Sequence, residues 1–170
     1  MPTTTQAPRG AELFRHQARM VRQVVGMNLA GVTHEESLAH PSGGGNSINW
    51  VLGHLLWVYE GALPLVGQRP VLGRDAVARY ARGGAALVEG EEPLPLAELQ
   101  AAWDQAADRI DQGLAALPDD ALDRPAPFSP SNNPEETVGS LIATVLFHQT
   151  YHGGQLGVLR RVAGKPGAIR

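Results

Sequence analysis

One segment of the chain is apolar on almost every side when it is drawn as a helix. Between Ser47 and Leu63 the apolar side chains fall at nearly every helical angle. A helix of this kind is stable only when other elements cover it on most sides. Ser47 is a suitable N-terminal cap, and Pro64 is expected to end or kink the helix. The chain must therefore supply further elements that surround residues 47–63.

Two other segments have a clear helical periodicity. In residues 11–30 apolar side chains recur three and four positions apart, so we expect a face made of Leu13, Gln17, Met20, Val24 and Met27, widened by Phe14, Val21 and Val25. Residues 96–117 carry a stripe of the same kind, which ends just before Pro118. Both segments are long enough to cover the helix at residues 47–63.

The last helix has the clearest start. Asn133 is a suitable cap, Pro134 suits the first helical position, and Glu136 has the spacing to complete a capping box. The apolar pattern then continues to about Val162 and ends at Gly164. We therefore expect the fourth long helix to begin at the Asn133 cap.

The connections complete the expected architecture. Residues 66–95 are rich in glycine and proline and form a long link with one short helix near residues 74–82. No stretch alternates as a strand would over a useful length. The periodicity predicts an all-α four-helix bundle of antiparallel helices. We expect a single domain over residues 1–170, in which residues 1–10 form a flexible N-terminal tail.

Composition limits the classes of function. The chain has 170 residues with a net charge of −3 at pH 7 and no basic stripe, so no nucleic-acid partner is expected. The most apolar stretch, residues 48–66, is interrupted by His54, Glu60 and Pro64 and is a poor membrane span. Glu60 is expected to face water or to pair with an arginine. The N-terminal residues lack the pattern of a secretory signal, so we expect a cytoplasmic protein with no membrane partner.

Histidines on the last helix supply a candidate metal-binding pair. The chain contains no cysteine, which excludes disulfides, iron–sulfur clusters and a cysteine nucleophile. One face of the last helix, with steps of four and three, consists of Leu141, Val145, His148, His152, Gln155 and Leu159. His148 and His152 are four residues apart, a spacing that lets two imidazoles bind one ion.

A third histidine is expected to point toward this pair. His54 lies in the helix that is apolar on most sides, one turn from each of Trp50 and Trp57, which are expected to form dry walls beside it. Three neutral imidazoles around one divalent ion leave open coordination positions, as in catalytic sites. The alternative is that the histidines are hydrogen-bonded core residues. A shared ion satisfies all three, whereas each unsatisfied buried group costs about 1–3 kcal/mol.

Two motifs of the chain stand in a recognisable order. They are Asn46-Ser-Ile-Asn-Trp-Val-Leu-Gly-His54-Leu-Leu-Trp57 and His148-Gln-Thr-Tyr-His152-Gly-Gly-Gln155-Leu-Gly-Val-Leu-Arg-Arg161. Together they resemble the second and fourth helices of the DinB-like (DinB/YfiT) superfamily of four-helix bundles. That family carries one histidine on the second helix and an HxxxH pair on the fourth, and these bind a divalent metal. The resemblance implies that the metal ligands are His54, His148 and His152.

The resemblance also implies an architecture and a class of activity. The expected fold is an up-down-down-up bundle with a long connection between helices 2 and 3, and the expected assembly is a homodimer. The superfamily includes thiol-dependent S-transferases and hydrolases. We therefore expect a metalloenzyme that uses zinc or nickel to activate a low-molecular-weight thiol toward a small electrophile, or to activate water. A metal-binding stress-response protein without turnover and a helical interaction domain are the alternatives.

Other polar residues near the motifs have competing interpretations, and no catalytic residue is assigned. Gln155 lies one turn past His152 and either orients a ligand histidine or bonds across the bundle. Gln149 occupies the place of the glutamate in the HExxH motif of zinc proteases, which disfavours that class of hydrolase. Tyr151 is expected to serve in packing or in a dimer contact. The loop residue His34 is expected to be solvated.

Overall fold

The computed structural model describes residues 10–84, 92–118 and 120–169. Within these ranges the secondary structure is helical, apart from one isolated bridge between Pro125 and Thr137, so the all-α expectation is confirmed. The tail expected over residues 1–10 lies outside the described residues except for Gly10, which begins α1. The α-helices and 3-10 helices (η) are α1 (Gly10–Leu29), α2 (His34–Ser37), α3 (Ile48–Ala62), η1 (Leu63–Val66), η2 (Arg74–Tyr80), α4 (Leu96–Ala116), η3 (Ala121–Asp123) and α5 (Val138–Val162).

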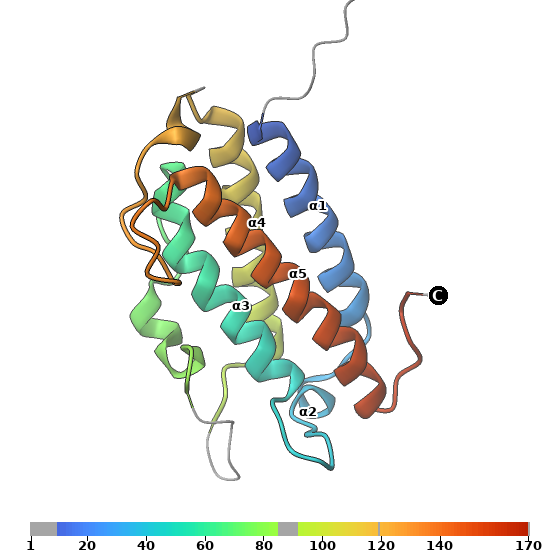
Figure 1. Ribbon diagram of the computed structural model, residues 1–170. Coiled ribbons are helices and arrows are strands. Elements are labelled where there is room, and N and C mark those ends of the chain that lie inside the picture. Colours follow the sequence, from blue (N-terminus) through green and yellow to red (C-terminus); the bar gives the residue numbers. More distant parts are fainter. Residues whose placement is uncertain (1–9, 85–91, 119, 170) are drawn as a thin grey trace, which may run out of the picture.

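The long helices α1, α3, α4 and α5 lie side by side (Figure 1). α1 packs against α4 and α5, and α3 packs against the same two helices. Figure 1 shows that α3 and α4 begin at the end of the molecule where α2 lies, whereas α1 and α5 begin at the opposite end. The chain leaving α3 must therefore return along the molecule before α4 begins. This return explains the length of the link, and its helix η2 packs against α3.

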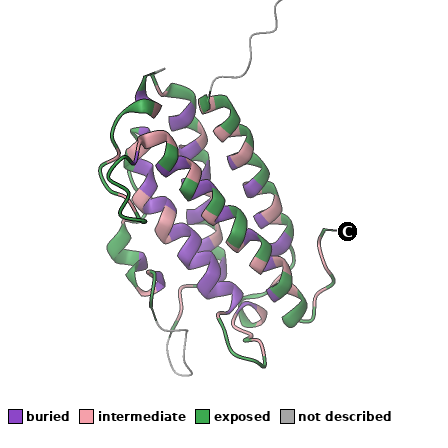
Figure 2. Ribbon diagram, viewed as in Figure 1, coloured by how far each residue is buried: buried purple, intermediate pink, exposed green. Residues whose placement is uncertain are grey.

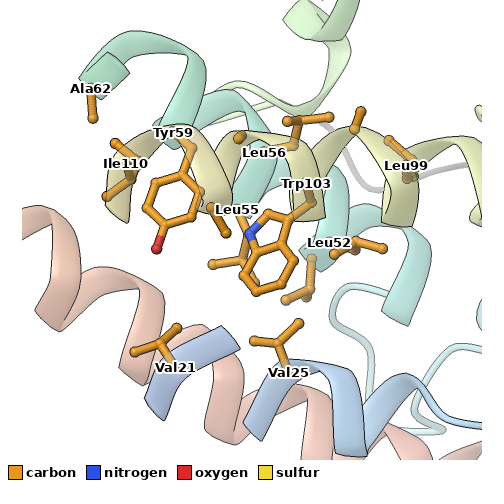
Figure 3. Packing of buried hydrophobic residues seen from close by; sticks show 14 of the residues in the cluster. Val21, Val25, Leu52, Leu55, Leu56, Tyr59, Ala62, Leu99, Trp103 and Ile110 are labelled. Carbon is orange, nitrogen blue, oxygen red and sulfur yellow. The ribbon is translucent and has the colours of Figure 1, made fainter. Parts of the chain in front are cut away.

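α3 is the most buried of the long helices (Figure 2). Trp103 of α4 and Val21 and Val25 of α1 converge on its apolar side chains (Figure 3). The side chains of α3 drawn in the same cluster are Leu52, Leu55, Leu56, Tyr59 and Ala62. The expectation of a helix covered on most sides is therefore confirmed.

α3 also begins and ends where the sequence predicts. The Ser47 hydroxyl accepts a hydrogen bond from the N–H of Trp50 at 3.3 Å. After Ala62 the backbone tightens into η1, whose second residue is Pro64. No helix in the described part of the chain combines the length and the apolar character that a membrane span requires.

The apolar face predicted for α1 is partly wrong. Leu13, Met20 and Met27 are 58%, 54% and 38% exposed, so they lie at the surface. The buried positions of this helix are Ala18, Val21, Val25, Asn28 and Leu29. The helix is therefore rotated away from the orientation that its strongest heptad pattern indicates.

Ion pairs join one side of α1 to α4. The guanidinium groups of Arg15 and Arg19 lie 3.3 and 2.9 Å from the Asp111 carboxylate. One turn further, Arg22 pairs with Asp104 at 3.2 Å. Partial burial acts to raise the pKa of Asp111, but the hydrogen bonds from Arg19 and Arg15 outweigh it and hold that pKa below its ordinary value. Because the arginine side of α1 faces α4, the edge with Leu13 and the two methionines turns outward.

α5 begins later than the sequence predicts, because its cap is Thr137. Asn133 instead forms a turn in which its side-chain oxygen accepts a hydrogen bond from the N–H of Glu135 at 3.0 Å. The carbonyl of Glu136 accepts a hydrogen bond from the N–H of Ala126 at 2.8 Å. This pairing with a distant segment keeps the chain extended until Thr137, so the capping box predicted for residues 133–136 does not form.

Tyr59 offers a test of how this core is packed. Its side chain is fully buried, its ring stacks on Trp103 with centroids 6.0 Å apart, and its hydroxyl has no hydrogen-bond partner within the described residues. Tyr59→Phe removes the unsatisfied group and keeps the ring. We expect the free energy of unfolding to rise by about 1 kcal/mol, measured by urea denaturation. A loss of stability in this variant would mean that the hydroxyl has a bonding partner in solution.

Candidate metal centre

Three histidines from two helices converge in the interior of the molecule. His54 comes from α3, and His148 and His152 come from α5. One nitrogen of each ring lies within 4.8 Å of the corresponding nitrogens of the other two. The ring centroids are 4.9 Å apart for His54 and His148, 5.1 Å for His54 and His152, and 4.4 Å for His148 and His152. His54 is buried and the other two are half-buried.

Hydrogen bonds orient two of the three rings. Nδ1 of His54 lies 2.7 Å from the carbonyl oxygen of Tyr80. Nδ1 of His152 lies 2.6 Å from the side-chain oxygen of Gln155. Both oxygens are acceptors, so the ring proton is on Nδ1 and the lone pair is on Nε2. This is the arrangement in which metal-ligating histidines are usually held.

His148 lacks such a bond. Its Nδ1 is buried without a hydrogen-bond partner in the described part of the chain, and its Nε2 lies 3.1 Å from Nε2 of His54. With the proton on Nδ1, a buried donor is unpaired and two lone pairs face each other. With the proton on Nε2, a buried acceptor is unpaired instead. A cation between the rings accepts the lone pairs of all three, so this donor set fits a divalent ion.

The surroundings keep the imidazoles neutral, which is the form that binds metals. Burial is the main cause that lowers the pKa of each ring. For His148, burial together with the nearby charges of His152, His54 and Arg82 lowers the pKa to about 4. The hydrogen bond to Gln155 acts in the opposite direction on His152 but does not cancel the effect of burial.

The Tyr80 carbonyl is held in place by a small hydrogen-bond network. The Tyr80 hydroxyl donates to the side-chain oxygen of Asn49 at 3.1 Å and accepts from the N–H of Leu94 at 3.1 Å. The amide nitrogen of Asn49 donates to the Leu94 carbonyl at 2.8 Å. The Tyr80 ring lies directly over Gly53, where an added Cβ would be 2.4 Å from the ring. Gly53 thus allows η2 to approach α3 and to reach His54.

Aromatic side chains enclose the cluster, as the sequence predicts for the two tryptophans. Trp50 and Trp57 stack on opposite sides of His54, with ring centroids 5.0 and 5.9 Å away. The guanidinium carbon of Arg74 lies 3.9 Å from the centre of the Trp57 ring. Tyr151, which is exposed, meets the His152 ring edge-on at 5.2 Å.

Gln149 faces away from the cluster and holds helices together. It is fully buried, its amide nitrogen donates to the Leu55 carbonyl at 2.9 Å, and its oxygen accepts from the indole N–H of Trp103 at 3.3 Å. These bonds join α5 to α3 and to α4. Gln149, which stands where the HExxH motif has its glutamate, therefore has a structural role in the core of this protein.

The expectation for Glu60 needs correction. Glu60 is buried and pairs with no arginine among the described residues. Its carboxylate instead accepts hydrogen bonds from backbone N–H groups at the start of the return segment, those of Val71, Leu72 and Gly73. His34 is exposed, as expected, and its Nδ1 also accepts a hydrogen bond from the N–H of Leu96 at 3.2 Å at the start of α4. Neither contact could be predicted from the sequence, because Glu60 and His34 each accept hydrogen bonds from backbone N–H groups of another segment.

The fold and this cluster define a class: an all-helical protein in which histidines from two packed helices form a potential metal site. The family model of the DinB superfamily matches residues 14–156, and the chain belongs to this superfamily. The matched range contains all three clustered histidines. The resemblance carried by the two sequence motifs is therefore confirmed. A comparison with curated proteins gave no match.

Gly53→Ala tests whether the approach of η2 controls the cluster. The new methyl group would push the Tyr80 ring away from α3 and loosen the bond between the Tyr80 carbonyl and His54. We expect zinc affinity to fall by about 10–100-fold, the usual effect of removing an orienting partner, measured by chelator competition. Gly26→Ala in α1 is the control, because a Cβ there meets no atom within 4 Å. Equal zinc affinities in the two variants would contradict this role of Gly53.

Proposed function

We propose that the protein is a divalent-metal-dependent enzyme in which His54, His148 and His152 bind the ion. The observation that carries this proposal is the orientation of the rings. The Tyr80 carbonyl and Gln155 engage the Nδ1 atoms of two histidines and leave the Nε2 lone pairs for a ligand. Nε2 of His148 lies 3.1 Å from Nε2 of His54, so it faces the same space as the other two rings. Imidazole ligands suit zinc, nickel, copper and iron, and of these we propose zinc or nickel.

The chemistry follows from the three neutral ligands. A divalent ion held by three imidazoles lowers the pKa of a thiol or a water molecule at an open position. Because the chain has no cysteine, the thiol belongs to a low-molecular-weight cosubstrate. Trp50 and Trp57 exclude water from the sides of His54, and Gln155 holds His152. In S-transfer, the thiolate sulfur bonds to an electrophilic carbon, and the leaving group departs with its electron pair and takes a proton from solvent.

The charge around the site favours an anionic cosubstrate. The positive charge of Arg82 acts on both His54 and His148, whereas no carboxylate of the described residues contributes to the pKa shifts of the three histidines. Arg82 is exposed and follows Tyr80, the residue that holds His54, by two positions. A thiolate that also carries a carboxylate is therefore attracted to this rim.

The wider features of the superfamily belong to the same proposal. We infer an up-down-down-up bundle that forms one domain, acts as a homodimer and resides in the cytoplasm. The common starting end of α3 and α4 in Figure 1 supports this helix order. The match of the family model over residues 14–156 supports the single domain.

Metal content is the first test. Protein made without a histidine tag is expected to contain about one divalent ion per chain, measured by elemental mass spectrometry. The double variant His148→Ala, His152→Ala is expected to contain none, since one imidazole alone binds weakly. His16→Ala, an exposed histidine outside the cluster, is the matched control and is expected to keep the ion. If wild-type protein takes up neither zinc nor nickel, the metalloenzyme proposal fails and the interaction domain becomes the better hypothesis.

A second experiment tests the thiol and the role of Arg82. Cobalt-loaded protein is titrated with mercaptosuccinate, and a new sulfur-to-metal absorption band is expected. Arg82→Gln is expected to weaken this binding by about tenfold, which corresponds to ~1.4 kcal/mol. Binding of the neutral thiol 2-mercaptoethanol is expected to stay the same in both proteins. No absorption change with either thiol would remove the thiol hypothesis and leave the activation of water.

A further inference from the structure

Arg74, the first residue of η2, lies against α3 close to the histidine cluster but outside it. Its guanidinium carbon is 3.9 Å from the centre of the Trp57 ring. An added Cβ at Gly61 would lie 3.5 Å from the same guanidinium group. Trp57 and Gly61 are one turn apart on α3, so together they form a base on which the guanidinium rests. This contact gives an exposed arginine a defined position.

The Trp57 ring separates this guanidinium from His54. His54 precedes Trp57 by one turn of α3 and stacks on its ring, with centroids 5.9 Å apart and an angle of 13° between the planes. Gly61 follows Trp57 by one turn, so Arg74 covers the other face of the indole. One aromatic ring therefore lies between a candidate metal ligand and a fixed positive charge. A small molecule that lies along the edge of this half-buried ring can reach both.

The backbone that leads into Arg74 is held by the buried carboxylate of Glu60. Its oxygens accept hydrogen bonds from the N–H groups of Val71, Leu72 and Gly73 at 3.0, 2.9 and 3.2 Å. A buried carboxylate requires such partners, because an unpaired charge in the core is strongly destabilising. These bonds fix the residue before Arg74 and so the point from which its side chain starts. Glu60 is therefore a positioning residue for Arg74.

The N–H donors of Arg74 are available to a ligand. Its guanidinium forms neither a hydrogen bond nor an ion pair within the described residues. A guanidinium that is stacked on an aromatic face keeps its donors in its own plane, where they can bind two oxygens of a carboxylate or a phosphate. Between residues 69 and 82 the chain has four arginines and one acidic residue, Asp75, so this surface attracts anions.

We propose that Arg74 binds a carboxylate or phosphate group of the electrophilic substrate. The inference rests on the proposed metalloenzyme and adds the place where the end of the substrate remote from the ion is held. An anion held at a fixed charge beyond Trp57 positions the rest of the molecule beside His54. Binding energy from a remote group of this kind orients the reacting carbon.

Arg82 and Arg74 serve different anions in this arrangement. The charge of Arg82 acts on His54 and His148, whereas Arg74 contributes to the pKa shift of none of the three histidines. Arg82 is therefore the arginine that a metal-bound thiolate meets first. Arg74 lies farther from the ligand nitrogens, on the far side of Trp57, and remains for the second substrate.

Binding of benzoate and of phenyl phosphate to the full chain, with and without added zinc, tests this site by isothermal titration calorimetry. Arg74→Gln is expected to weaken the binding of at least one probe by about tenfold, because the charged donors are lost. The probe that responds shows whether the site takes a carboxylate or a phosphate. Arg69→Gln is the matched control, since it removes the same charge from an exposed position earlier in the same segment. It is expected to bind both probes as wild-type protein does.

Four results separate this site from the alternatives. The site is overturned if neither probe binds wild-type protein, or if Arg74→Gln and Arg69→Gln weaken binding equally, since net charge alone then attracts the anion. Binding that requires zinc and is unchanged in Arg74→Gln means that the probe binds the ion directly, so the anion site fails and the metal centre stands. Binding that depends on Arg74 in a protein that takes up no metal keeps the anion site and removes the metalloenzyme. Unchanged zinc content and thermal midpoint in Arg74→Gln show that weakened binding does not come from misfolding.

Discussion

The burial of α3 is the constraint on which the other features depend. This helix is apolar on nearly all sides, so it needs α4 and α5 beside it and additional cover from η2. Because α3 and α4 begin at the same end of the molecule, the chain between them returns along α3. That return segment brings the carbonyl oxygen of Tyr80 to 2.7 Å from Nδ1 of His54. The segment that covers the helix therefore also orients a candidate metal ligand, and a short turn would do neither.

Polar groups inside this core fall into two kinds. Glu60 and Gln149 bind groups of other segments and so stabilise the arrangement of the helices. The hydroxyl of Tyr59 and Nδ1 of His148 have no partners within the described residues. Tyr59 is surrounded by apolar side chains, so its hydroxyl is a packing defect (Figure 3). His148 differs from Tyr59 in its second polar atom, because its Nε2 lies 3.1 Å from Nε2 of His54 and belongs to the candidate ligand set.

Periodicity predicted the helices, the burial of α3 and the convergence of the histidines, because spacing along a helix determines which side chains share a face. It did not predict the rotation of α1, whose Arg15 and Arg19 pair with Asp111 of α4. Nor did it predict the late start of α5, which depends on pairing with a distant segment. The contact of the Tyr80 carbonyl with His54 could not be predicted from the sequence either, because every residue has a backbone carbonyl. Gly53 was the available signal, since a glycine inside a bulky helix marks a close approach.

The charged contacts of the molecule are distributed unevenly among its long helices. The inner side of α5 holds the histidines, and from Val138 to Leu159 the helix carries no Asp, Glu, Lys or Arg. The charged contacts are concentrated instead between α1 and α4, where arginines meet Asp111 and Asp108. Added salt shortens the screening length, which is about 10 Å at 0.1 M, and so weakens exposed ion pairs, whereas apolar burial is not weakened in this way. The α1–α4 contact and the surfaces of α5 therefore depend on different forces, and added salt weakens only the first.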